Sequence, residues 1–147
     1  MRRILAIALA AIAVLAVPAL GAGSKFSATL NGKSETPKSN SKATGSATVT
    51  ISGKSLKYTL KASGLTGGAQ AAHIHYGKPG QAGPVIFVIC AKPCSLPKSG
   101  TLTSKAFTKA PAVKTFAAAL KAIRAGRTYV NIHTKKHPAG EIRGQLK

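Results

Sequence analysis

The stretch YVNIHTKKHPAGEIRGQL, from Tyr129 to Leu146, decides the fold of this chain. Before its central turn, Val130 and Ile132 alternate with polar residues, and after the turn Ile142 and Leu146 fall on one side of a second short arm. Side chains two apart on a strand share one face of a sheet, so each arm is typical of a strand with one apolar face. The proline and glycine between the arms predict a terminal antiparallel β-hairpin.

The rest of the chain repeats this two-residue period in short segments separated by turn-forming residues. Val49 and Ile51 lie on one face of the segment SATVTIS, and Leu56, Tyr58 and Leu60 lie on one face of SLKYTLKAS. The connection between these two segments is short enough for a second hairpin. Further strands are expected at residues 26–30, 69–76, 84–89 and 100–107.

A helical period occurs once, at residues 111–125. Pro111 suits the first turn of that helix, and Gly126 suits the position just after its end. Short strands at regular turn spacing favour an all-β protein. The predicted fold is an antiparallel Greek-key β-sandwich, immunoglobulin-like or superoxide-dismutase-like, with one short helix before the C-terminal hairpin.

The first residues are predicted to be a secretory signal peptide, residues 1–22, followed by one domain at residues 23–147. Arg2 and Arg3 precede an apolar run that Pro18 ends, and small residues follow. The run is shorter than the roughly 20 residues that a spanning helix needs, so a transmembrane anchor is the weaker alternative. We therefore expect a secreted or periplasmic protein with no membrane span after cleavage.

The charge balance narrows the classes of function. The chain has 22 lysine and arginine residues against two acidic ones, Glu35 and Glu141, for a net charge of +20. Only this one pair of carboxylates could perform acid–base catalysis, and no Gly-x-Ser-x-Gly nucleophile motif occurs, so we expect no enzyme. The spread lysines would attract a polyanion, but the more common alternative is a solvated basic surface, and the few aromatic residues argue against a specific nucleic-acid binder.

Cys90 and Cys94, the only two cysteines, lie in the segment CAKPC. In an exported chain such a pair is expected to form one disulfide. A thiolate metal or redox site is the alternative, but the spacing is one residue longer than Cys-x-x-Cys and no second pair exists.

Three histidines form the candidate site. His73 and His75 share one face of a predicted strand, and His133 lies with Asn131 on the polar face of another. If the two strands are neighbours, the three imidazoles converge, and a site of this kind would suit copper or zinc. The alternative is a structural role, in which ring nitrogens bond to carbonyls of the glycine-rich loop after His75.

Three motifs together resemble the CHRD domain: AAHIHYGKPGQAGPV at 71–85, LKAIRAGRTYVNIHTKKHPAGEIRGQL at 120–146 and LNGKSETP at 30–37. The resemblance covers Phe26 to Leu146. It implies a β-sandwich in an extracytoplasmic setting and no established catalytic activity. The positions carried over from it are Glu35, His73, His75, Gly83, Pro84, Asn131, His133, Thr134, Gly140, Glu141, Arg143 and Gly144. His137 falls where the family's turn varies and is not counted as a ligand.

The polar residues around the histidines have two possible roles. Glu141 and Arg143 share a face of the last strand, where the pair could orient an imidazole or form a structural ion pair. Glu35, Asn131 and Thr134 are assigned to the same supporting set. The predicted function is an exported, non-catalytic CHRD module that binds a protein or an anionic polymer of the cell envelope. The alternative is copper or zinc binding through His73, His75 and His133.

Overall fold

The structure, a computed structural model, describes residues 23–147, and the predicted signal peptide lies outside the described residues. These residues form eight strands, one α-helix and two short 3-10 helices. Their bounds are β1 (Ser24–Asn31), η1 (Gly32–Ser34), β2 (Thr44–Ser52), β3 (Ser55–Ser63), β4 (Ala69–Tyr76), β5 (Val85–Cys90), β6 (Lys98–Leu102), η2 (Ser104–Ala106), α1 (Phe116–Arg124), β7 (Thr128–Thr134) and β8 (Ile142–Gln145).

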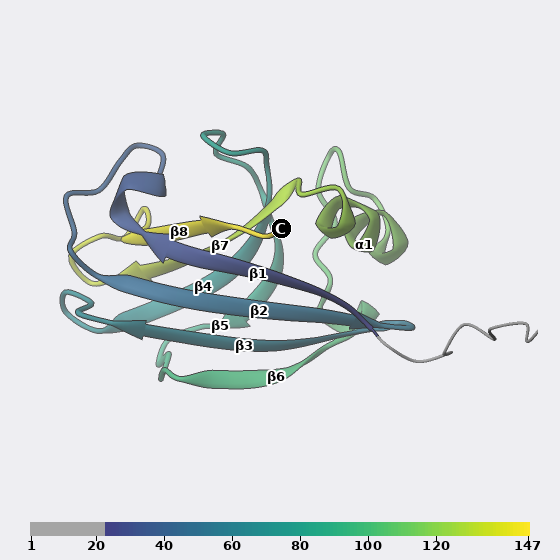
Figure 1. Ribbon diagram of the computed structural model, residues 1–147, viewed down its shortest axis with the longest axis horizontal. Helices are drawn as coiled ribbons and strands as arrows, with labels where there is room; N and C mark the ends of the chain where they lie inside the picture. The colour runs from purple at the N-terminus through teal and green to yellow at the C-terminus, as the bar shows by residue number, and fades with distance from the viewer. Residues whose placement is uncertain (1–22) are drawn as a thin grey trace, which may run out of the picture.

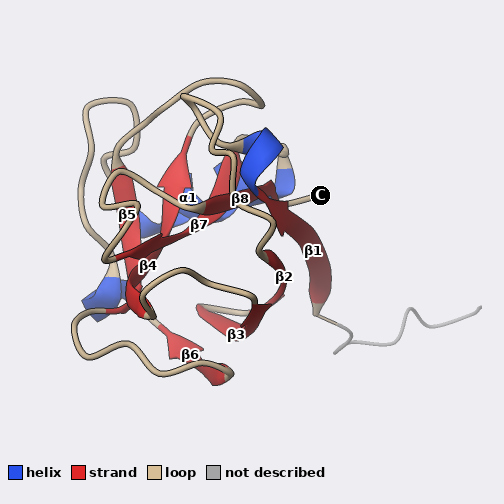
Figure 2. Ribbon diagram, turned by 90° about the vertical axis from the view of Figure 1, so that its left-hand side faces the viewer, coloured by secondary structure: helices blue, strands red, loops and turns tan. Residues whose placement is uncertain are grey.

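All eight strands join one antiparallel sheet in the order β5-β4-β7-β8-β1-β2-β3-β6. The sheet curls until it nearly closes into a barrel (Figures 1 and 2). The hydroxyl of Tyr58 on β3 donates a hydrogen bond to the carbonyl of Ile89 on β5, 3.4 Å away, across the side where closure is incomplete. The antiparallel all-β class is confirmed, whereas the two separate sheets of a Greek-key sandwich are not. Alternation fixes which face of a strand is buried but not which strands pair.

The predicted apolar faces form the interior of the sheet. Val49 and Ile51 on β2 and Leu56 and Leu60 on β3 are all at most 2% exposed. The two strands form the expected hairpin, with Ser52 paired to Ser55 across a two-residue turn. The turn begins with a glycine at a φ of 55°, a conformation that glycine adopts without steric cost.

The helix is shorter than predicted. Its N-cap is Thr115, whose side chain accepts a hydrogen bond from the Ala118 amide at 3.1 Å. Pro111 instead lies in a tight turn closed by two backbone hydrogen bonds between Ala110 and Val113, so its placement in the first helical turn was wrong. Apolar spacing continued through this turn because Val113 is buried without being helical. No helix within residues 23–147 is long and apolar enough to cross a membrane.

The terminal hairpin and the disulfide follow the prediction. β7 and β8 are antiparallel neighbours, with Asn131 paired to Arg143. Cys90, the last residue of β5, is bonded to Cys94. The two sulfurs are therefore bonded to each other and are not free thiolates for a metal ion, and a disulfide is compatible with an extracytoplasmic location.

Candidate metal centre

Strands β4, β7 and β8 lie side by side and carry the candidate residues on the outer face of the sheet. Their inward neighbours, such as Ile74 on β4 and Val130 on β7, are fully buried in the core. The hydrogen-bond register places the outward side chains in rows: His73, Asn131 and Arg143; His75, Tyr129 and Gln145; and Ala71 with His133. The pairing of β4 with β7 is what brings distant histidines together.

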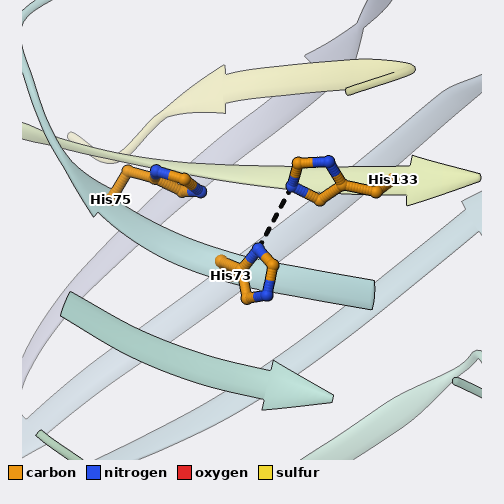
Figure 3. A group of neighbouring side chains, drawn as sticks. All are labelled: His73, His75 and His133. Atoms are coloured by element: carbon orange, nitrogen blue, oxygen red, sulfur yellow. Dashed lines mark hydrogen bonds between the residues drawn. The ribbon is translucent and has the colours of Figure 1, made fainter. Parts of the chain in front are cut away.

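The three predicted histidines converge. Nδ1 of His73 lies 3.1 Å from Nε2 of His133, and one nitrogen from each of the three rings lies within 4.8 Å of the others. Figure 3 shows the rings of His75 and His133 approaching from opposite sides, with His73 between and below them. His75 is 8% exposed, whereas His73 and His133 are half-buried. An ion could therefore reach the cluster from solvent.

Backbone carbonyls fix the orientation of two of the rings. Nδ1 of His75 donates to the carbonyl of Gly83 at 2.7 Å, and Nδ1 of His133 donates to the carbonyl of Pro138 at 2.9 Å. A carbonyl can only accept, so both rings carry their proton on Nδ1 and leave Nε2 as a lone-pair donor. Metal-binding histidines are commonly oriented in this way. The same hydrogen bonds would also be present if the histidines had only the structural role described above as the alternative.

The environment keeps the rings of His73 and His75 uncharged. Burial, followed by the charges of His133 and His75, lowers the pKa of His73 from 6.5 to about 4. Burial also lowers the pKa of His75, and this outweighs the opposite effect of its hydrogen bond to Gly83. At neutral pH both imidazoles are therefore neutral, which is the form that binds a metal ion.

Tyr129 is a member of the site to which the sequence analysis gave no role. Its ring stacks on His75 with centroids 4.8 Å apart and planes 10° apart. The guanidinium carbon of Arg143 lies 3.3 Å from the centroid of the same ring. The Tyr129 hydroxyl accepts from the amide of Gly83 at 3.1 Å. One aromatic side chain thus supports both a histidine and the loop that orients it.

Glu141 neither orients an imidazole nor forms an ion pair with Arg143. It is fully buried just before β8, where its carboxylate accepts hydrogen bonds from the hydroxyls of Ser41 at 2.6 Å, Thr134 at 2.6 Å and Thr66 at 2.8 Å. The Thr66 amide donates to it as well, at 3.1 Å. Glu141 therefore joins two loops to the end of β7 instead of contacting Arg143 or a ring nitrogen. Ser41 and Thr66 could not be found by sequence spacing, because they lie far from it in the chain.

Glu35 and Asn131 lie on the side of the cluster nearest β8. Glu35 is 6% exposed, and its Oε1 has no hydrogen-bond partner in the described part of the chain. Burial raises the pKa of Glu35, although the Thr36 amide, the charge of Arg143 and the Asn131 side chain act in the opposite direction. In the hydrogen-bond register of the sheet, Asn131 on β7 lies between His73 on β4 and Arg143 on β8.

The fold and the site define an all-β protein with a histidine cluster on the outer face of its sheet. The sequence pattern of the CHRD domain matches residues 26–146 of this chain. The chain belongs to the CHRD domain family, as the three motifs predicted. Searches of curated proteins and of solved structures found no match.

Proposed function

We propose that this CHRD domain binds a transition metal ion, copper or zinc, through His73, His75 and His133. The observation that carries the proposal is Nε2 of His75, which is buried and has no hydrogen-bond partner within residues 23–147. In a purely structural histidine both ring nitrogens are normally satisfied, because an unpaired buried acceptor is costly. Here the loop satisfies Nδ1 and leaves the other nitrogen directed towards two further imidazoles (Figure 3).

The spacing of the nitrogens suits a metal after small side-chain rotations. Bonds of 2.0–2.1 Å in tetrahedral geometry place ligand nitrogens about 3.3 Å apart. The His73–His133 separation of 3.1 Å is close to this value, and the largest separation, 4.8 Å, must shorten. His73 would also have to move its proton from Nδ1 to Nε2, which its half-exposed position allows. Three imidazoles leave one coordination position open.

The test is metal uptake by the protein purified without a histidine tag. We expect near-stoichiometric copper or zinc, falling below about one tenth of that level in His73→Ala and His133→Ala because each removes one of only three ligands. His137→Ala is the matched control, since His137 lies in the neighbouring turn outside the cluster, and should retain the metal. A folded wild-type protein that takes up neither metal would make the histidines structural.

A second candidate function rests on the surface. Both acidic side chains of the chain, Glu35 and Glu141, are buried, at 6% and 0% exposure. Exposed charged side chains of the described residues are therefore all basic. This supports the association of the domain with an anionic polymer of the envelope.

That association should depend strongly on salt. We expect co-sedimentation with an anionic polymer at low ionic strength and release as the salt concentration rises, because screening shortens the range of exposed charges. A neutral polymer of similar size is the control and should not retain the protein. Retention that does not change with salt would contradict an electrostatic mode of binding.

A further inference from the structure

A cavity of about 430 Å³ lies between the loop that follows η1 and strand β8. Its lining includes Lys33, Glu35, Lys38, Pro79, Arg143 and Gln145. None of the three histidines contributes to it. Its volume is within the range typical of small-molecule pockets, which is roughly 300–1,000 Å³. The cavity is therefore a second potential binding site, separate from the candidate metal centre.

Arg143 is the buried cation at the base of this cavity. The residue is only 2% exposed, and its guanidinium lies flat against the Tyr129 ring. Within the described residues, its side chain makes one hydrogen bond, from Nη2 to the carbonyl of Lys78 at 2.9 Å. A guanidinium has five N–H donors, so most of them have no partner within residues 23–147. Stacking on Tyr129 fixes the plane of the group and leaves its N–H edge available to a planar acceptor.

The charges around Arg143 favour an anion. Lys33 and Lys38 are exposed at the rim, and Glu35 is the only acidic residue in the lining. The charge of Glu35 acts on Arg143, yet within residues 23–147 its carboxylate does not accept a hydrogen bond from the guanidinium. Burial raises the pKa of Glu35, which weakens its competition as a counterion. Among the residues that the structure describes, Arg143 is thus buried without a bound anionic partner.

We propose that this cavity binds a small organic carboxylate, held by the free edge of the Arg143 guanidinium with Lys33 and Lys38 at the entrance. The planar, two-oxygen carboxylate matches the fork of an arginine and can accept two parallel N–H hydrogen bonds. Charge-assisted bonds of this kind are stronger in a low-dielectric environment, and the Arg143 side chain is only 2% exposed. The site uses no metal ion, so it does not depend on the proposed function of the histidines.

The test is a titration of metal-free protein with lactate, succinate or inorganic phosphate, followed by the amide NMR signals of the loop that contains Gly80. We expect saturable shifts with a carboxylate, and at least about tenfold weaker binding in Arg143→Gln. Glu35→Gln should bind the carboxylate more tightly because it removes the one negative charge from the lining. Lys57→Gln, which removes an exposed charge outside the cavity, should bind as the wild type does.

Three outcomes would overturn the proposal. The first is that folded wild-type protein binds neither carboxylate saturably. The second is that phosphate alone saturates the site. The third is that Arg143→Gln and Lys57→Gln weaken carboxylate binding equally. If Arg143→Gln does not fold, Arg143→Lys replaces it, because lysine keeps the charge and loses the fork. Weaker carboxylate binding in the lysine variant supports the proposal, and unchanged binding contradicts it.

Discussion

Replacing Glu141 with glutamine should lower the free energy of unfolding at neutral pH by roughly 3 kcal/mol or more, because hydrogen bonds to a buried charged group are each worth about 1.5–3 kcal/mol. The carboxylate accepts from the hydroxyls of Ser41, Thr66 and Thr134 and is fully buried. A glutamine amide cannot accept at its nitrogen. At least one of these hydroxyls would therefore lose its acceptor in a region closed to water.

The contribution of Glu141 should also depend on pH. Burial alone would raise the pKa of Glu141, but the hydrogen bonds from Ser41, Thr134 and Thr66 together lower it below the ordinary 4.5. A carboxyl whose pKa is lower in the folded state stabilises the protein above the unfolded value, and this stabilisation disappears as the pH falls through the folded pKa. The difference between wild type and Glu141→Gln should therefore be largest above pH 4.5 and shrink in acid.

Urea unfolding at neutral and acidic pH would measure this, with Glu35→Gln as the matched control. Glu35 is also buried, but its pKa is raised, so its ionised form costs stability above pH 4.5. The same substitution should therefore be neutral or stabilising at position 35. Equal destabilisation by the two variants would show that the hydrogen bonds around Glu141 have no special weight.

Gly83→Ala should destabilise the protein by roughly 3 kcal/mol, the upper end of the usual cost of overpacking. A Cβ at Gly83 would collide with the backbone carbonyl oxygen of Tyr76, which cannot rotate away as a side chain can. The two segments are held together by the Tyr76 amide, which donates to the Pro84 carbonyl at 2.9 Å. The loop must therefore move away from β4 to admit the methyl group.

The same change should weaken metal binding if the histidine site is as proposed. The carbonyl of Gly83 accepts the Nδ1 proton of His75 at 2.7 Å, and its amide donates to the Tyr129 hydroxyl at 3.1 Å. Loss of such an orienting bond typically lowers metal affinity about 10–100-fold.

Gly53→Ala is the control for the Gly83 substitution. Gly53 has a φ of 55° and an added Cβ would meet no atom within 4 Å, so only the cost of a left-handed backbone conformation, roughly 1–2 kcal/mol, applies. Thermal unfolding and a metal titration of both variants would compare them. If the two alanine variants had equal stability, the close approach of Gly83 to Tyr76 would not matter.

Much of the fold could be predicted from local sequence patterns, and the predictions failed where a local pattern does not specify the structure. The alternation of Val49 and Ile51, and of Leu56 and Leu60, predicted two strands and their buried faces because a side-chain period is a local property. The helix start was misplaced because Val113 continues an apolar pattern while lying in a turn.

The candidate site likewise has features that the sequence determined and features that it could not determine. The sequence alone determined that His73 and His75 share a face, that His133 and Asn131 share another, and that the chain belongs to the CHRD family. It could not determine that β4 pairs with β7, because pairing is chosen by the packing of the whole sheet and not by either strand.

Only the tertiary structure decided what each polar residue contacts. It placed the Gly83 carbonyl on His75, and it surrounded Glu141 with hydroxyls from distant loops. It also left Arg143 buried against Tyr129 at the base of a cavity. Strand periodicity acts between neighbours in the chain, whereas these contacts form between segments that meet only after the sheet has curled. The sequence therefore determined which residues share a face of each strand, and the tertiary structure determined which polar groups meet.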